Sequence, residues 1–119
     1  MRMLRFIGVA VVATACASTR IPESGDPAMA ISTAERAIAD AQAAGADTLA
    51  SGILTEAQTA LDAARTSANT DRNRAAMHAR VAAANAAYAQ AVAQRTIAER
   101  ERAAAQAELQ RVPPPGGTQ

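Results

Sequence analysis

Several residue types are scarce or missing in this chain, and each absence excludes a class of site. The 119 residues include no Lys and no Trp, and only one Cys, one His, one Phe and one Tyr. A single His cannot supply the repeated histidine ligands of a typical metal site. With no glycine-rich phosphate loop either, we expect neither a metal nor another cofactor.

Large apolar side chains are also few, which limits what the chain can bury. Ala occupies 35 positions, so the 50% apolar content overstates the available bulk, because a buried methyl group contributes only about 0.8 kcal/mol. The sequence therefore predicts one small domain with a thin core. Such a core leaves little material to enclose a substrate cavity or bury a pair of catalytic carboxylates. We expect a non-enzyme with no small-molecule substrate.

The first sixteen residues, MRMLRFIGVAVVATAC, have the layout of a secretory signal peptide. Arg2 and Arg5 precede an apolar run over residues 6–13, and small residues follow. The run is too short for a membrane-spanning helix, which needs about 20 apolar residues. A buried N-terminal helix is the alternative interpretation. We expect residues 1–15 to be removed as a signal peptide.

Cys16 gives this segment a more specific interpretation. Ala13, Thr14 and Ala15 precede it and resemble the bacterial lipobox, in which the Cys is lipidated and becomes the mature N-terminus. A lone Cys in an exported chain has no disulfide partner within the chain, and more than one acyl chain anchors a protein stably. The alternative is a secreted protein cleaved after Ala15 or Ala17. By analogy with enterobacterial sorting, the absence of Asp after Cys16 indicates the periplasmic face of the outer membrane rather than the inner membrane.

Without residues 1–15, the charge balance becomes slightly acidic, with ten Arg against eleven acidic residues. No basic stripe remains to neutralise phosphates, and one aromatic residue offers no stacking platform. We therefore expect no nucleic-acid partner. The missing Lys also excludes covalent attachment to peptidoglycan through a C-terminal lysine.

Pro and Gly divide the mature chain into three parts. Every Pro lies at position 22, 27 or 113–115, and only Gly45 and Gly52 interrupt the long span between them. Residues 16–27 are polar and rich in helix breakers, which predicts a flexible tether. Residues 28–112 predict a helical domain, and residues 113–119 (PPPGGTQ) predict a disordered Pro/Gly tail.

Within the domain, the apolar spacing predicts three helices. The first covers about 28–44, with Pro27 in the first turn and Gly45 as the C-cap. The second covers about 51–68, and the third runs from about 71 to 111, roughly 60 Å at 1.5 Å per residue. The expected core positions of the first two helices are Ile31, Ala34, Ile38, Ala41, Leu54, Ala57, Leu61, Ala64 and Ala68.

The third helix carries two apolar stripes, and a helix that is apolar on two sides usually contacts two partners. One stripe contains only Ala, at positions 75, 79, 82, 86, 89 and 93. The bulkier stripe consists of Met77, Val81, Ala84, Tyr88 and Ala91 or Val92. We expect the two shorter helices to cover these stripes, which gives an all-α, antiparallel three-helix bundle with coiled-coil-like Ala packing. The third helix would extend past the bundle.

The overhanging part of the third helix is a candidate partner surface. Arg95, Glu99 and Arg102 lie on one helical face there. They could bind an envelope protein or a second copy of the chain. The simpler interpretation is a solvated helix end.

The chain resembles the bacterial lipoproteins of domain-of-unknown-function family 4398. The resemblance lies in residues 37–46 (AIADAQAAGA), 54–64 (LTEAQTALDAA) and 79–94 (ARVAAANAAYAQAVAQ), downstream of a lipobox and a Pro-containing tether. It covers most of residues 16–110. The resemblance implies a lipoprotein that faces the periplasm, and it implies no catalytic activity.

The sequence therefore favours a lipid-anchored envelope protein with a helical structural or interaction module. Three alternatives stay open. The chain could be a self-assembling coiled-coil spacer, a non-covalent peptidoglycan binder, or a soluble, chaperone-like periplasmic protein without the lipid on Cys16. Self-assembly would make the melting temperature depend on concentration, polymer binding would show in sedimentation with sacculi, and a chaperone would leave the membrane fraction.

Overall fold

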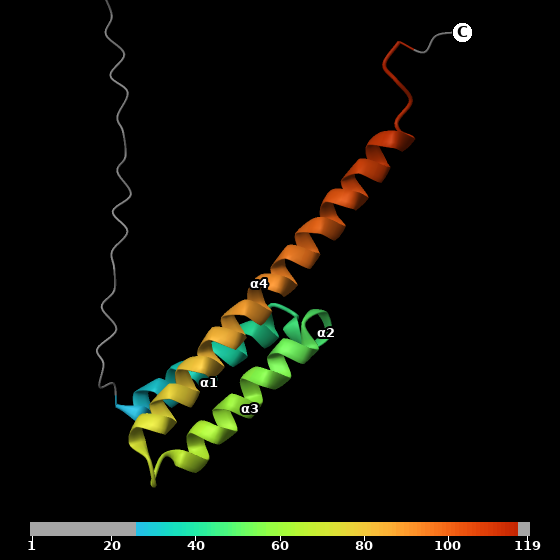
Figure 1. Ribbon diagram of the computed structural model, residues 1–119. Coiled ribbons are helices and arrows are strands. Elements are labelled where there is room, and N and C mark those ends of the chain that lie inside the picture. Colours follow the sequence, from blue (N-terminus) through green and yellow to red (C-terminus); the bar gives the residue numbers. More distant parts are fainter. Residues whose placement is uncertain (1–25, 117–119) are drawn as a thin grey trace, which may run out of the picture.

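The computed structural model describes residues 26–116, in which every regular element is a helix. These described residues form four helices: α1 (Pro27–Ala43), α2 (Ala46–Leu49), α3 (Ser51–Ser67) and α4 (Arg72–Arg111). Figure 1 shows α1 and α3 lying along the first half of α4, while the second half of α4 extends beyond both. The all-helical class and the long C-terminal helix are as the sequence predicted.

Local capping determines where α1 begins and ends. The Asp26 side chain accepts a hydrogen bond from the backbone N–H of Ala28, and Pro27 occupies the first helical position, where its missing N–H costs nothing. At the other end, Gly45 adopts a left-handed conformation with φ +87°. Its N–H donates to the carbonyl of Gln42 at 2.9 Å. The left-handed residue ends the helix, as the position of Gly45 predicted.

The segment between α1 and α3 contains a helix that the sequence analysis did not predict. No helix was expected between the C-cap at Gly45 and the helix that starts at about residue 51, yet α2 forms a single turn that ends at Leu49. Asp47 lies in its first turn, where a negative charge is favourable, and Leu49 packs half-buried against the core. The break is limited to Ala50, whose backbone leaves the helical region at φ −147°.

Asp71 begins α4, because its side chain accepts a hydrogen bond from the N–H of Arg74 at 2.9 Å. The helix then continues for 40 residues, about 60 Å. Val112 leaves the helical conformation directly before three consecutive prolines. The helical conformation is disfavoured for a residue that precedes Pro, so the prolines after Val112 end the helix here.

The core consists largely of alanine side chains. On α1 and α3, the predicted positions Ala34, Ile38, Leu54 and Leu61 are buried, and Ile31 is half-buried. On α4, the stripe that contains only Ala is buried throughout: Ala75, Ala79, Ala82, Ala86, Ala89 and Ala93. Methyl groups let helices approach closely, and α4 contacts α1 and α3 far more extensively than these two contact each other. The Ala stripe of α4 is therefore the centre of the fold.

Except at Val92, no described residue covers the second, bulkier stripe of α4, and this corrects the sequence prediction. Met77 is 55% exposed, Val81 45% and Tyr88 61%, although all three were expected to face one of the shorter helices. Both α1 and α3 fit on one wide arc around the Ala stripe, because half-buried positions such as Ala83 and Val92 widen that arc. Within residues 26–116, nothing packs on the opposite face of α4.

Candidate functional site

The predicted lipidation site lies outside the described residues. Cys16 and the lipobox residues Ala13, Thr14 and Ala15 all precede Asp26, where the described chain begins. Asp26 caps α1 at the end of the molecule where α4 also starts (Figure 1). The chain therefore enters the described domain at that end, opposite the free end of α4.

The predicted partner surface lies on α4 near the point where the core ends. Arg95 Nε donates a hydrogen bond to Glu99 Oε1 at 2.8 Å, and this bond raises the pKa of Arg95 above its ordinary value. Both side chains are largely exposed, as is Arg102 one turn further on. The structure thus brings Arg95 and Glu99 together, as the four-residue spacing predicted, and places Arg102 on the adjoining turn.

The packed core ends close to this surface. Ala93 is the last buried residue of α4, and residues 97–111 are all exposed. These fifteen residues form an arm of about 22 Å at 1.5 Å per residue. The arm and the residue that follows it carry three exposed large apolar side chains: Ile97, Leu109 and Val112.

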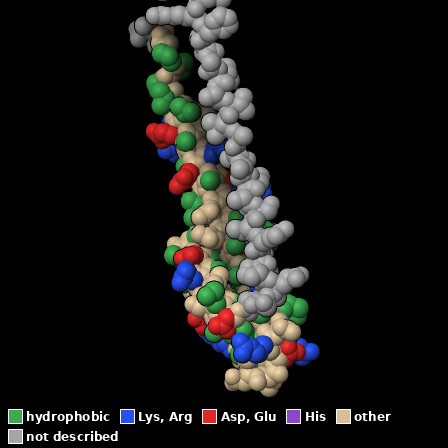
Figure 2. All heavy atoms as spheres, turned by 90° about the vertical axis from the view of Figure 1, so that its left-hand side faces the viewer, with side chains coloured by type: hydrophobic (Ala, Val, Ile, Leu, Met, Phe, Trp, Pro, Cys, Tyr) green, Lys and Arg blue, Asp and Glu red, His purple; other side chains and the backbone are tan. Residues whose placement is uncertain are grey.

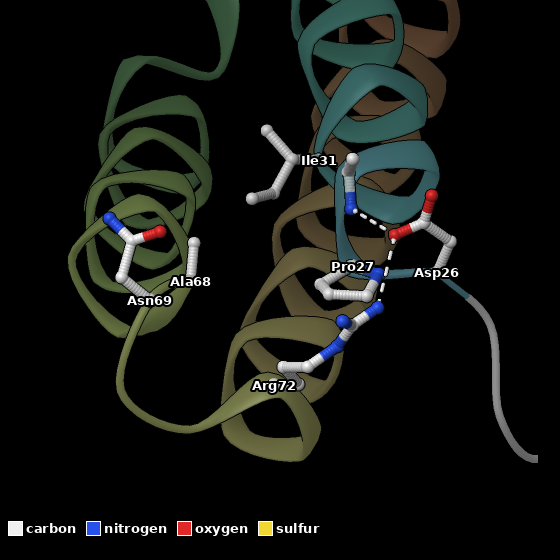
Figure 3. A pocket seen from close by; sticks show the side chains of 7 residues that line it. Asp26, Pro27, Ile31, Ala68, Asn69 and Arg72 are labelled. Carbon is white, nitrogen blue, oxygen red and sulfur yellow. Dashed lines mark hydrogen bonds and ion pairs between the residues drawn. The ribbon is translucent and has the colours of Figure 1, made fainter.

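An open depression of about 420 Å³ lies at the other end, between the start of α1 and the turn from α3 to α4 (Figure 3). Ile31 and Ala68 line its apolar side, and an ion pair between Asp26 Oδ1 and Arg72 Nη2 at 3.8 Å closes its rim. Asp26 also caps α1, so its carboxylate holds the first turn and Arg72 together. The polar groups here are exposed and serve structural contacts.

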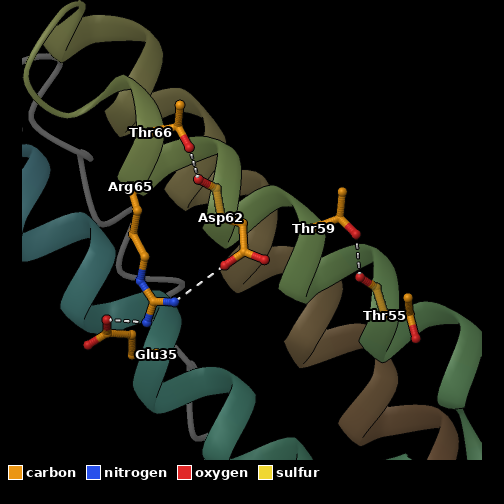
Figure 4. Close-up of polar contacts among 6 residues, drawn as sticks. All are labelled: Glu35, Thr55, Thr59, Asp62, Arg65 and Thr66. Atoms are coloured by element: carbon orange, nitrogen blue, oxygen red, sulfur yellow. Dashed lines mark hydrogen bonds and ion pairs between the residues drawn. The ribbon is translucent and has the colours of Figure 1, made fainter.

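A polar row follows the outer face of α3 (Figure 4). Thr55, Thr59 and Thr66 each donate their hydroxyl hydrogen to the backbone carbonyl four residues earlier, at 2.8–2.9 Å. The donors are therefore used within the helix. Arg65 reaches from this row to α1, where its Nη2 lies 2.7 Å from Glu35 Oε1, and this bond raises the pKa of Arg65. The ion pair links α1 to α3, which touch each other far less than each of them touches α4.

Residues 26–116 offer little reactive chemistry. No three His, Cys, Asp or Glu side chains in this region lie close enough to hold a metal ion, and none of its polar or charged side chains is buried. His78 is half-exposed. Within the same region, no helix is both long and apolar enough to cross a membrane.

The feature that the sequence analysis assigned wrongly is the outer stripe of α4, which we define as Met77, Val81, Ala84, Tyr88 and Ala91. Its spacing of four, three, four and three residues was visible in the sequence, but only the exposed fractions show that no part of the described chain covers it. Figure 2 shows hydrophobic side chains among charged ones along one exposed side of the molecule. The outer stripe is therefore a second candidate contact surface, in addition to Arg95 and Glu99.

No family model, no curated protein and no solved structure matches this chain.

Proposed function

We propose that this chain is a lipid-anchored lipoprotein of the cell envelope, held at the periplasmic face of the outer membrane by lipid on Cys16. The observation that carries the proposal is the N-terminal order of charged, apolar and small residues that ends at Cys16. The resemblance to family 4398 supports the same placement. The helical domain would then act as a structural or interaction module rather than as an enzyme.

The fold we propose for this module is a small antiparallel three-helix bundle in which α2 is part of the connection between α1 and α3. The packing of α1 and α3 on the Ala stripe of α4 supports it. Short connections at both ends of α3 also favour neighbours that run in opposite directions. In this arrangement α4 is the axis of the bundle, because α1 and α3 each contact it far more extensively than they contact each other.

The proposed mechanism is tethering. Lipid at Cys16 would fix the end of the domain that contains Asp26, and α4 would carry Arg95, Glu99 and Arg102 away from that end. Exposed charges at the base of a projecting arm suit recognition of another envelope protein, because charged groups at a contact rim steer association and select orientation. No catalytic group is needed for this role.

The test is intact-mass analysis of the full chain extracted from the membrane of a bacterial host. We expect a mass that starts at Cys16 and includes acyl chains. The Cys16→Ser variant should lose the acyl mass, whereas the control Ser18→Ala, two residues away, should keep it. Unmodified wild-type protein would contradict the anchor and favour the soluble, chaperone-like alternative.

Membrane sorting needs a separate experiment. Density-gradient fractionation should place the wild-type chain in the outer membrane of an enterobacterial host, and Ala17→Asp should shift it to the inner membrane. Sedimentation with purified sacculi then distinguishes the peptidoglycan-binding alternative, since a tethered module without polymer affinity stays in the supernatant. Equal distribution of wild-type protein and Ala17→Asp between the two membranes would contradict the outer-membrane assignment.

A further inference from the structure

The outer stripe of α4 lies directly opposite the buried Ala stripe. Each of its members follows a buried Ala by two residues, which is about 200° around the helix. Met77, Val81 and Tyr88 are about half-exposed or more, and Ala84 and Ala91 of the same stripe are exposed as well. The stripe therefore has the 3-4 spacing of a coiled-coil seam but no partner within the described chain.

We propose that a second copy of this chain packs on the outer stripe, with the two α4 helices antiparallel. The first argument is the alternation of large and small side chains. When Ala84 of one copy lies opposite Tyr88 of the other, Val81 falls opposite Ala91. The large side chains of Tyr88 and Val81 then each meet an alanine, which is the arrangement that fills the space between two helices without voids.

Parallel pairing lacks this complementarity. It places Tyr88 against Tyr88 and Ala84 against Ala84, so the helix separation that suits one layer is wrong for the next. The antiparallel register also places Arg95 opposite Met77 of the other copy. The aliphatic stem of an arginine can cover an apolar side chain while its guanidinium stays in water. That arrangement accommodates the charge of Arg95, which continues the seam beyond Ala91.

Charge along α4 provides an independent argument. From residue 72 to residue 98 the helix contains Arg but no acidic residue, and its first carboxylate is Glu99. In the antiparallel register, Glu99 of one copy lies beside Arg74 of the other. In a parallel pair, the basic half of each helix would lie against the basic half of its partner. Opposite charges across the flank select the antiparallel orientation.

A twofold-symmetric pair of this kind uses the same surface in both copies. Its apolar contact is short and consists mainly of Met77, Val81 and Tyr88 from each chain, so the dimer should be weak and concentration-dependent. The pairing does not involve Cys16. The inference therefore stands or fails separately from the lipid anchor.

The first experiment measures sedimentation equilibrium of the full chain carrying Cys16→Ser, over a range of concentrations. We expect monomer and dimer in exchange, and Tyr88→Glu should raise the dissociation constant at least tenfold. Two controls place the same charge on other exposed apolar residues, Leu109→Glu on the arm of α4 and Met29→Glu on α1. Both should leave the dissociation constant unchanged.

Tyr88 is exposed, so the variant should keep the helical circular dichroism of the parent chain. If Tyr88→Glu unfolds, Tyr88→Ala replaces it, because Ala is the best helix former. Association that both Tyr88 variants leave unchanged would overturn the proposal, since it would then involve residues 1–15 or the arm. A wild-type chain that stays monomeric at every concentration would overturn it as well.

A second experiment tests the orientation. Ala84→Cys and Tyr88→Cys are made separately in the Cys16→Ser chain, one carrying a size tag, and then mixed and oxidised. Antiparallel pairing predicts mixed 84–88 disulfides in excess over links between identical positions. An excess of 84–84 and 88–88 links would show parallel pairing and contradict the proposed register.

Discussion

Replacing Leu61 with Ala tests whether the thin core holds the fold together. Leu61 on α3 is only 6% exposed, and the substitution removes three carbon atoms, worth about 2.4 kcal/mol at 0.8 kcal/mol each. Its neighbours in the core are mostly Ala, whose methyl groups have no alternative rotamers to fill the space. The resulting cavity adds to the transfer loss, and we expect a total of about 3 kcal/mol.

The matched control is Val81→Ala on the outer stripe, which the sequence analysis expected one of the shorter helices to cover. Val81 is 45% exposed, so the loss of two partly buried carbon atoms amounts to about 0.9 kcal/mol. Ala is the better helix former by up to about 0.7 kcal/mol, which offsets most of this loss. The net change should stay below about 0.5 kcal/mol.

The assay is urea and thermal denaturation followed by circular dichroism, on the full chain carrying Cys16→Ser and at a concentration too low for self-association. For a domain of this size, 3 kcal/mol corresponds to a Tm lower by about 12–24 °C, while Val81→Ala should shift the Tm by no more than a few degrees. Equal destabilisation by the two substitutions would mean that the outer stripe is covered in the monomer. A neutral Leu61→Ala would mean that α3 does not pack on α4.

Three further predictions use backbone and polar contacts. Gly45→Ala should lower the free energy of unfolding by about 1–2 kcal/mol in urea denaturation, because φ at this position is +87°. Gly52→Ala should raise it by up to about 1 kcal/mol, because Gly52 is helical and no heavy atom lies near the new methyl group. A change of the same sign in both variants would contradict the role of Gly45 as the C-cap of α1. Asp71→Ala removes the N-cap of α4 and should cost about 1 kcal/mol, while Asp71→Asn, which can still accept the bond, should recover most of it. Because the Glu35 carboxylate raises the pKa of Arg65, the contribution of this guanidinium is present below its ordinary pKa and is lost only as the pH rises beyond that. The difference in free energy of unfolding between wild type and Arg65→Gln should therefore be constant from about pH 7 to about pH 10. A difference that shrinks within this range would contradict the raised pKa of Arg65.

The helix boundaries were predictable because local chemistry determines them. Gly45, Asp71 and the prolines after Val112 each end or begin a helix through contacts with their immediate neighbours. Each predicted limit of the three expected helices lies within one residue of the observed limit. The unpredicted α2 depends instead on Leu49 packing against the core, and that contact is not visible in local sequence.

Burial on α4 was not predictable for a different reason. The Ala stripe and the outer stripe have the same period, so hydrophobic spacing cannot distinguish the face that packs from the face that does not. Side-chain size was also misleading as a guide to burial, since the larger residues Met77 and Tyr88 are the exposed ones. The contact between Arg65 and Glu35, thirty residues apart in sequence, was likewise beyond prediction, whereas the Arg95–Glu99 pair followed from helical spacing.

The two proposed contacts of α4 are not independent. In the antiparallel pair, Arg95 and Glu99 of one copy lie beside Met77 and Arg74 of the other, so self-association covers most of the surface proposed for an envelope partner. Arg102 and the rest of the arm extend past the first turn of the other α4 and stay accessible. If an envelope protein binds through Arg95 and Glu99, it must therefore compete with the second copy. Tyr88→Glu would then increase binding to that protein, whereas a partner that binds only the arm beyond Arg102 would bind wild type and Tyr88→Glu equally.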